Sequence, residues 1–356
     1  MRADRRVLVT GAGGFIGGRM VELLWESGWG EVRAGVRRWE SAARIGRYPV
    51  EIVLCDVMNP AQLAAAMEGA THVVNCAYGG GDTNVSGTRN VLEAALAAGV
   101  ERVVHLSTID VYGEAVGEVD ESRPVQRTGR EYGDSKIESE QLCLEFHRKH
   151  GLAVSVLRPT IVYGPFSGGW VEEFAQRLQM RPWLLPEEDC RGTCNLVYVD
   201  DLVNATVLAL ESDRAPGEAF NVNGPDRVTW NDYFHALNGA MGLPPLATAN
   251  RRAAQLGAWV MLPVRRSAKA VLNRFGDQIM SLYQRSELAK AVMKGGERLI
   301  RQSPTPGEFQ MYSREVHFGT GKAAALLGYA PRFAMDEGVA HSAAWLRHHG
   351  LAPAAR

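Results

Sequence analysis

Apolar and polar positions alternate in two distinct ways along the first 160 residues of the chain. Short apolar runs, of the kind that form buried strands, occur at 6–10, 31–36, 51–55, 71–76, 101–107 and 153–159. Between these runs the apolar positions recur at helical spacing, as they do from Val85 to Leu96 before Gly99. This alternation predicts an α/β fold, a doubly wound parallel sheet covered by helices on both faces.

The alternation stops midway along the chain, which predicts two domains. Residues 1–165 form the first domain, and a strand and helix within 195–222 return to it. Residues 166–194 and 223–356 are irregular or helical, with one further strand expected at 314–318. We assign them to a smaller, mostly helical substrate-binding lid, and because ligand clefts favour domain interfaces we expect the substrate site there.

Composition narrows the class of partner. The chain has 356 residues, of which 46% are hydrophobic, and a formal net charge of −1. This near-neutral balance gives no electrostatic reason to expect nucleic acid as a partner. The five cysteines lack the spacing of a disulfide framework, and the one close pair, Cys190 and Cys194, has no further ligands for zinc. We therefore expect no metal.

Membrane association is not predicted either. The first strand begins so near the N-terminus that no room is left for a signal peptide. The longest strongly apolar run, 256–264, is too short to span a bilayer, and it has arginines on both sides. We interpret these arginines as the solvated ends of a lid helix rather than as a membrane-surface contact. The expected location is cytoplasmic.

Glycines follow the first strand in the spacing G-x-x-G-x-x-G, at Gly11, Gly14 and Gly17. In a strand–turn–helix of this order the glycines permit a tight turn, and the helix N-terminus presents free N–H groups to a pyrophosphate. We therefore predict a Rossmann-type dinucleotide site, with Phe15 and Ile16 also beside the cofactor.

The end of the second strand bears on the choice of cofactor. An NAD(H) site usually offers an acidic residue there to the ribose, whereas this chain continues with Arg37 and Arg38. Arginine pairs well with a phosphate, so NADP(H) is the preferred cofactor and NAD(H) the alternative. Asp56 and Val57, after the third strand, are placed to meet the adenine.

The segment YGDSK places Tyr132 and Lys136 one helical turn apart on one face. A tyrosine with a pKa of about 10 is a poor base near neutrality. A neighbouring ammonium and a positive nicotinamide would lower that pKa by favouring the phenolate. The pair is therefore a candidate acid/base unit.

Seven segments occur in an order and at separations that resemble one known family. They are TGAGGFIG, CDV, NCA, STIDVYG, YGDSK, LRPTIVYGP and VYVDDLV. Together they resemble the extended short-chain dehydrogenase/reductase family, in its NAD(P)-dependent epimerase/dehydratase-like branch. The resemblance covers most of the chain and is weakest at 230–315.

The resemblance implies a role for each matching residue. Tyr132 would be the acid/base, Lys136 would hold the nicotinamide ribose, and Thr108 would hydrogen-bond the substrate oxygen. Asn84 would lie near the proton path. The further cofactor contacts would be Ala77, Pro159 and Ile161. The family also implies a homodimer that packs through the helices carrying Asn84 and Tyr132.

One departure from the family pattern concerns the reaction. Dehydratases of this family carry an Asp–Glu pair directly after the threonine, whereas this chain has Ile109 and Asp110. Isoleucine cannot protonate a leaving hydroxyl, which disfavours a dehydratase. Asp110 falls where related nucleotide-sugar decarboxylases carry glutamate. It either contacts the substrate or orients its own loop through backbone bonds.

A second departure concerns the substrate. The arginine that helps nucleotide-sugar members to hold a diphosphate is replaced by Cys194, with Arg191 three residues earlier. Trp170 is a candidate substrate contact in the lid. These features favour a less polar small-molecule substrate.

Three functions follow from these residues. The preferred one is an NAD(P)-dependent oxidoreductase that moves hydride between the nicotinamide and a carbonyl or secondary alcohol, with net oxidation or reduction. The alternative is a nucleotide-sugar epimerase or decarboxylase-type enzyme that retains and recycles its cofactor. A non-catalytic NADP-binding sensor is disfavoured, because Tyr132, Lys136 and Thr108 are all present.

Overall fold

The computed structural model describes residues 5–180, 183–247, 249–263 and 304–353, together with 265, 267, 271, 274 and 302. The chain divides into two compact units. Unit 1 comprises Met1–Ser167, Asn195–Asp226 and Val316–Gly338, and unit 2 comprises Gly168–Cys194, Arg227–Glu315 and Val339–Arg356.

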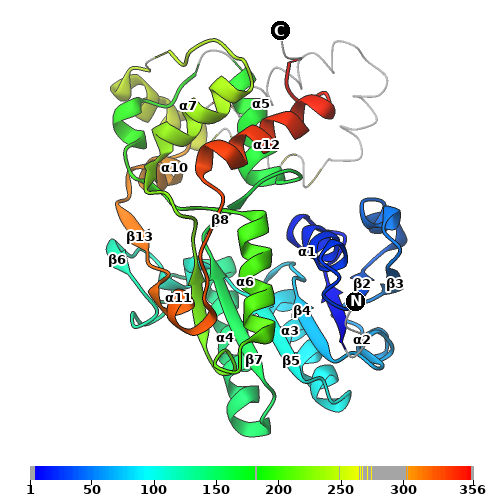
Figure 1. The fold of residues 1–356 in the computed structure, drawn as a ribbon. Helices are drawn as coiled ribbons and strands as arrows, with labels where there is room; N and C mark the ends of the chain where they lie inside the picture. The colour runs from blue at the N-terminus through cyan, green and yellow to red at the C-terminus, as the bar shows by residue number, and fades with distance from the viewer. Residues whose placement is uncertain are drawn as a thin grey trace. The chain divides into compact units, whose positions relative to one another are not determined.

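A seven-stranded sheet forms the centre of unit 1 (Figure 1). Its order is β11-β7-β5-β4-β1-β2-β3, and every neighbouring pair is parallel. The strands are β1 (Arg6–Thr10), β2 (Glu31–Val36), β3 (Glu51–Leu54), β4 (His72–Asn75), β5 (Arg102–Leu106), β7 (Val154–Pro159) and β11 (Ala219–Val222). The predicted α/β class and parallel sheet are confirmed.

Helices cover both faces of this sheet, because alternate strand residues point to opposite sides and both sides are apolar. Leu8, Val73 and Val103 share one apolar core with α2 (Pro60–Met67), α3 (Gly81–Ala97) and α4 (Glu131–His150). On the other face, α1 (Phe15–Glu26) packs against α6 (Val199–Glu211). Two of these helices, α3 and α4, also pack against each other.

The residues at the two ends of α4 explain where this helix begins and ends. Asp134 in the first turn accepts hydrogen bonds from the backbone N–H groups of Thr128 and Gly129, at 2.9 and 3.0 Å. The last turn is basic, which suits the negative end of the helix dipole. Gly151 then ends the helix in the left-handed conformation, with φ 71°.

The division of the chain differs from the predicted one at Val316–Gly338, which belongs to unit 1. The expected strand at 314–318 is β13 (Val316–Phe318), and it pairs in parallel with β6 (Gly117–Val119). Val316 and Phe318 pack with Tyr112 in a small apolar core of their own. This pairing joins segments so far apart in the sequence that local patterning gives no indication of it.

The segment that returns to unit 1 contains two strands rather than one. The strand predicted before the helix at 199–211 is β10 (Leu196–Tyr198), but it pairs with β8 (Ile161–Tyr163) in a separate two-stranded sheet. The strand that joins the main sheet is β11, beside β7.

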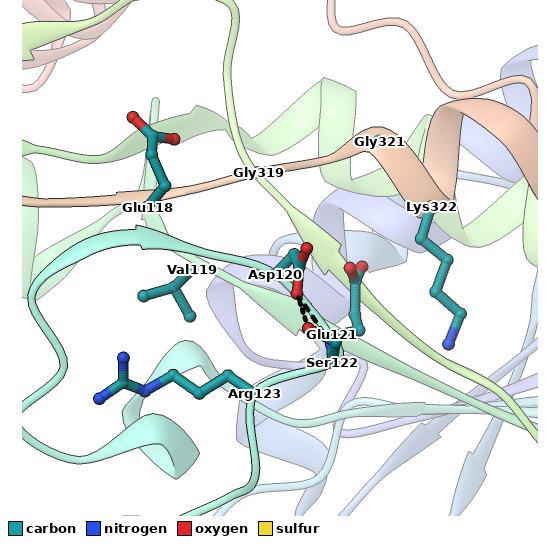
Figure 2. A pocket seen from close by; sticks show the side chains of 9 residues that line it. All are labelled: Glu118, Val119, Asp120, Glu121, Ser122, Arg123, Gly319, Gly321 and Lys322. Carbon is teal, nitrogen blue, oxygen red and sulfur yellow. Dashed lines mark hydrogen bonds between the residues drawn. The ribbon is translucent and has the colours of Figure 1, made fainter.

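Strand β11 lies at the edge of the main sheet, and side chains satisfy its backbone there. The N–H of Asn221 donates to Glu121 Oε1 at 2.6 Å, and Lys322 Nζ donates to the carbonyl of Ala219 at 2.9 Å. Figure 2 shows these charged residues beside a cavity of about 830 Å³ that is lined from Glu118 to Arg123 and by Lys322. The polar groups thus cover an edge that would otherwise pair with another chain.

Unit 2 is mostly helical and has an aromatic core. Its elements include η4 (Gly168–Glu172), α5 (Glu173–Gln179), α7 (Trp230–Ala240), α10 (Pro306–Ser313) and the antiparallel pair β9 (Thr193–Cys194) and β12 (Val228–Thr229). Two further helices are α11 (Gly321–Leu327), in unit 1, and α12 (Met335–His348). The ring contacts of unit 2 join Trp170, Phe174, Trp183, Trp230, Tyr233, Phe234 and Tyr312.

The predicted lid helix is helical over 251–263. Val264 at the end of its apolar run and Arg266 in its basic flank lie outside the described residues. Within the part of the chain that the structure describes, no helix is long and apolar enough to cross a membrane.

Candidate active site

The glycine-rich turn after β1 permits an approach of backbone to backbone that no other residue would allow. Gly11 has φ +65°, and a Cβ on it would lie 2.8 Å from the carbonyl oxygen of Cys76. A Cβ on Gly17 would lie 2.3 Å from the carbonyl oxygen of Gly11. Helix α1 begins directly after Gly14, with no side-chain cap and no acidic residue in its first turn. Its N-terminal N–H groups are therefore available to a pyrophosphate.

A cavity of about 520 Å³ opens over this turn. Its lining includes nine of the predicted cofactor residues, Gly11, Gly14, Phe15, Ile16, Gly17, Arg37, Asp56, Val57 and Ala77. Sequence reasoning did not single out Ser41, Tyr78 and Thr83, which also line it. Pro159 and Ile161 lie elsewhere, at the end of β7 and the start of β8. The cavity fits a dinucleotide, because the glycine turn, the uncapped helix and the arginine after β2 all border it.

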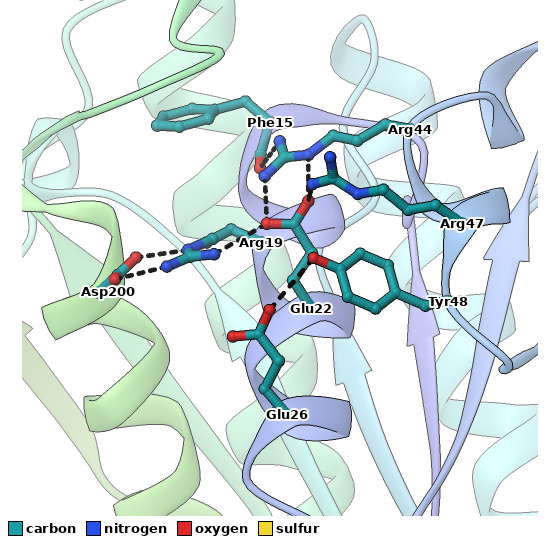
Figure 3. Close-up of polar contacts among 8 residues, drawn as sticks. All are labelled: Phe15, Arg19, Glu22, Glu26, Arg44, Arg47, Tyr48 and Asp200. Atoms are coloured by element: carbon teal, nitrogen blue, oxygen red, sulfur yellow. Dashed lines mark hydrogen bonds and ion pairs between the residues drawn. The ribbon is translucent and has the colours of Figure 1, made fainter. Parts of the chain in front are cut away.

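The segment after β2, which carries Arg37, is fastened to α1 by a buried carboxylate. Glu22 accepts hydrogen bonds from Arg44 at 2.7 and 2.8 Å, from Arg47 at 3.0 Å and from Arg19 at 3.0 Å (Figure 3). Burial raises the pKa of Glu22, but Arg44 and Arg19 together lower it below its usual value. Arg44 also donates to the carbonyl of Phe15 at 3.2 Å, so the cluster supports the first residue of α1.

The predicted acid/base residues meet at the end of β5. The Thr108 hydroxyl lies near the phenol of Tyr132, and its hydrogen-bonding effect lowers the pKa of that phenol. Although 38% of the Tyr132 surface is exposed, partial burial of the side chain outweighs this effect, and together with Asp110 and Tyr78 it raises the pKa of Tyr132 to about 12. From the sequence we expect Lys136 and a positive nicotinamide to lower the pKa of Tyr132. In the protein itself, burial has the larger effect on this pKa.

Lys136 lies one turn along α4 and is buried, with 5% of its surface exposed. Its ammonium donates to the carbonyl of Leu106 at 2.9 Å. Burial lowers the pKa of Lys136 to about 8, and the nearby Glu140 carboxylate opposes this effect. The ammonium is thus held at the carboxyl end of β5, without a direct ion pair to any residue that the structure describes.

Asn84 joins α3 to the helix that carries Tyr132. Its side-chain amide donates to Ser135 Oγ at 3.1 Å, and Ser135 Oγ donates to the carbonyl of Tyr132 at 2.9 Å. The Oδ1 of Asn84 accepts from the N–H of Gly79 at 3.2 Å. This bonding brings the predicted helix asparagine into the group formed by Tyr132, Lys136 and Thr108.

The two residues after Thr108 have different surroundings. Ile109 is buried and belongs to the apolar core shared with Val316 and Phe318. Asp110 is exposed, its N–H donates to Thr108 Oγ1 at 3.2 Å, and its charge raises the pKa of Tyr132. Of these two positions, only 110 places an acidic group near Tyr132.

The candidate substrate residues of the lid belong to unit 2. Trp170 is half-buried in the aromatic core, where its ring contacts Phe174 and Trp230. Cys194 is fully buried in β9, and Arg191 is exposed.

A buried ion pair that the sequence did not indicate lies beneath the site. Arg158 of β7 donates to both carboxylate oxygens of Glu140 on α4, at 2.9 and 2.6 Å. Glu140 also accepts from Ser107, the residue before Thr108, at 2.5 Å, and Arg158 donates to the Tyr112 hydroxyl at 2.8 Å. A signal was available, since Glu140 is one turn after Lys136 and on the same face of the predicted helix.

Comparison with known proteins places this site in a family. The model of the NAD dependent epimerase/dehydratase family matches residues 7–223. A dTDP-glucose 4,6-dehydratase from Streptomyces antibioticus is 31% identical over 278 residues, which cover 67% of this chain and 77% of the relative. A 3beta-hydroxysteroid-dehydrogenase/decarboxylase from Arabidopsis thaliana is 22% identical, over 94% of this chain and 61% of the relative.

Among solved structures, the fold is similar to that of a UDP-glucuronic acid 4-epimerase from Bacillus cereus in complex with NAD. The TM-score is 0.70 and the identity 19%, over 97% of this chain and 99% of the other. The family match spans β1 to β11 and includes the glycine turn, Thr108, Tyr132 and Lys136. The chain belongs to the NAD dependent epimerase/dehydratase family, in the extended short-chain dehydrogenase/reductase group.

Proposed function

We propose that this protein is a nucleotide-sugar epimerase or decarboxylase-type enzyme that oxidises a secondary alcohol of its substrate with a bound nicotinamide cofactor. The observation that carries the proposal is the grouping of Thr108, Tyr132 and the buried ammonium of Lys136 at the end of β5. The family match and the nucleotide-sugar relatives support retention of the cofactor over net oxidation. The enzyme with a recycled cofactor, which is the alternative from the sequence, thus has more support than the preferred interpretation, net oxidation or reduction.

The chemistry of the chain's own residues follows from their contacts. Thr108 and Tyr132 lie close together, so a substrate hydroxyl can bond both oxygens, and the phenolate of Tyr132 can accept its proton. Lys136 stabilises the phenolate form of Tyr132 that accepts this proton, because its ammonium is held one turn away and has little contact with water. When bound, the nicotinamide supplies the hydride acceptor. The glycine turn and the N-terminus of α1 would hold its pyrophosphate.

The residue after Thr108 supports an epimerase or decarboxylase over a dehydratase. Ile109 is a core side chain without a proton to give, and the exposed Asp110 is the acid near Tyr132. A carboxylate beside the oxidised carbon repels a second carboxylate on the substrate. That repulsion would favour the loss of carbon dioxide from a sugar acid.

The preference for NADP(H) rests on Arg37, which lines the cavity directly after β2. We infer that its guanidinium would pair with a 2′-phosphate. Arg37→Ser should weaken binding of NADP⁺ by about tenfold or more and leave binding of NAD⁺ within about threefold, since a charge-assisted hydrogen bond contributes ~1.5–3 kcal/mol. A variant that loses both cofactors equally would instead assign Arg37 to the shared part of the dinucleotide.

Denaturing the purified protein and identifying the nucleotide it releases tests retention of the cofactor. Recovery of about one nucleotide per chain supports a recycled cofactor. The purified enzyme is then offered UDP-glucose and UDP-glucuronic acid, with Tyr132→Phe as the inactive control. Turnover by Tyr132→Phe equal to that of the native protein would refute the proposed acid/base role.

A second candidate is net oxidation or reduction of a less polar substrate. The observation that favours it is the burial of Cys194 where an arginine would hold the substrate diphosphate. Such an enzyme releases its cofactor at each turnover, so it would be isolated without bound nucleotide. By resemblance to the family, we further propose a homodimer in the cytoplasm, and light scattering of the purified protein tests the dimer.

A further inference from the structure

A second tyrosine lies against the candidate acid/base. The rings of Tyr78 and Tyr132 have centroids 5.7 Å apart and planes at 80°. This is an edge-to-face contact of the kind that stabilises aromatic pairs beyond the area they bury. Tyr78 also lines the cofactor cavity, and 68% of its surface is exposed. It therefore lies between the cavity and the acid/base while remaining open to water.

The loop that carries Tyr78 is fastened by residues of the same site. The N–H of Gly79 donates to the side chain of Asn84 at 3.2 Å. The N–H of Gly81 donates to the carboxylate of Glu131 at 2.7 Å, and Glu131 directly precedes Tyr132. Both anchors are therefore connected to the helix turn that carries the acid/base.

The glycines of this loop lie so close to neighbouring atoms that the loop has little room for another conformation. A Cβ on Gly79 would lie 2.7 Å from the Thr83 side chain, and one on Gly81 would lie 3.0 Å from Glu131. The loop thus passes close to its neighbours at both positions. The contact between the rings of Tyr78 and Tyr132 therefore depends on how the loop is held as well as on the attraction between the two rings.

We propose that Tyr78 is a positioning residue, which holds the ring of Tyr132 and covers it from water. This inference rests on the proposed function, because it takes Tyr132 to be the acid/base. Tyr78 needs no proton transfer of its own for this role. Its ring, rather than its hydroxyl, carries most of the effect.

The role has a consequence for the titration of Tyr132. Burial and the nearby Tyr78 both raise the pKa of Tyr132, so removal of the Tyr78 ring lowers that pKa through each of them. Tyr78→Phe keeps the ring that covers Tyr132 and removes only the electrostatic effect of the Tyr78 hydroxyl. The other groups that act on Tyr132 are Thr108 and Asp110, with Lys136 one turn along α4, and all three stay in both variants.

The test measures phenolate formation at Tyr132 without a substrate. Tyrosinate absorbance is recorded after a rapid jump to alkaline pH, before unfolding begins, and the signal of the matching Tyr132→Phe protein is subtracted. We expect the midpoint to fall by about 0.5 pH unit or more in Tyr78→Ala and by less than half as much in Tyr78→Phe. Val116→Ala, at an exposed site of unit 1, serves as the control and should not change the titration midpoint of Tyr132.

The far-UV circular dichroism spectrum and the urea unfolding midpoint show that each variant is folded, and neither depends on the cofactor cavity that Tyr78 lines. An unchanged titration midpoint in a folded Tyr78→Ala protein would overturn the proposal. Equal shifts in Tyr78→Ala and Tyr78→Phe would also overturn it, since the hydroxyl would then carry the effect. Neither result depends on turnover, so a failure of the proposed function is seen separately, in the activity of Tyr132→Phe.

Discussion

Replacement of Lys136 by methionine should stabilise the nucleotide-free protein while removing its activity. Lys136 is a buried cation, and its one hydrogen bond in the structure is to the carbonyl of Leu106. The pKa of Lys136 falls from 10.5 to about 8, mainly because burial disfavours the charged form. At about 1.36 kcal/mol for each unit of pKa, holding the ammonium in this position costs roughly 3 kcal/mol at neutral pH.

Methionine removes this cost and fills a similar volume. It also leaves the Leu106 carbonyl without its donor, which costs about 1 kcal/mol. The net expectation is a gain of about 2 kcal/mol in the free energy of unfolding at pH 7. The expected sign is unusual, because most substitutions of buried residues destabilise a protein.

The pH dependence gives a sharper test than the gain itself. Between a folded pKa of about 8 and an unfolded pKa of 10.5, the unfolded chain binds more protons at Lys136 than the folded chain does. The contribution of Lys136 to native stability therefore rises with pH across this window. The advantage of Lys136→Met should be full below pH 8 and should fall by about 2 kcal/mol by pH 9.5.

Urea denaturation at several pH values between 7 and 9.5, on protein freed of nucleotide, measures this difference. Lys149→Met is the matched control, because Lys149 lies on the same helix with 55% of its side chain exposed. It should change the free energy of unfolding by less than about 0.5 kcal/mol at each pH. A Lys136→Met protein that is less stable at pH 7, or whose difference from the native protein does not vary with pH, would refute the argument.

Two further substitutions test the support beneath the site and the cofactor turn. Glu140→Gln leaves Arg158 buried without its counter-charge and should lower the free energy of unfolding by about 3–5 kcal/mol, whereas Glu138→Gln on the exposed side of α4 should change it by less than about 0.5 kcal/mol in the same urea titration. A loss below about 1 kcal/mol for Glu140→Gln would mean that water reaches Arg158. Gly17→Ala places a Cβ 2.3 Å from a backbone oxygen of the glycine turn and should weaken NAD⁺ binding by about tenfold or more, measured by calorimetry. Gly46→Ala, where no atom lies within 4 Å of an added Cβ, is its control, and equal affinities in the two variants would contradict the steric argument.

The sequence predicts the features that depend on local pattern. The apolar runs predict six strands of the main sheet because strands buried on both faces have continuous apolar composition. The turn at Gly11 and Gly17 is predictable because only glycine tolerates the close backbone approach that the structure contains. Tyr132 and Lys136 share a helix face by spacing alone.

The features that sequence reasoning missed depend on contacts between distant segments. A strand is predicted at β13, but its pairing with β6 is not, because the two strands have three residues each and lie far apart in the sequence. The ion pair of Glu140 with Arg158 joins a helix to a strand, and each residue alone resembles a surface charge. Tyr78 is exposed and follows a short strand, and only the fold reveals that its ring contacts Tyr132.

The site combines groups that are costly to bury with groups that offset that cost nearby. Lys136 keeps its charge at an energetic disadvantage, and the carboxylate of Glu140 raises the pKa of Lys136 from one turn away. Arg158 in turn pairs with Glu140, since it donates to both of its oxygens. A carboxylate that served Lys136 alone would bond it directly and would compete with a cofactor ribose for the ammonium. The fold instead commits Glu140 to Arg158 and Ser107, so the ammonium remains available while its charge is still supported.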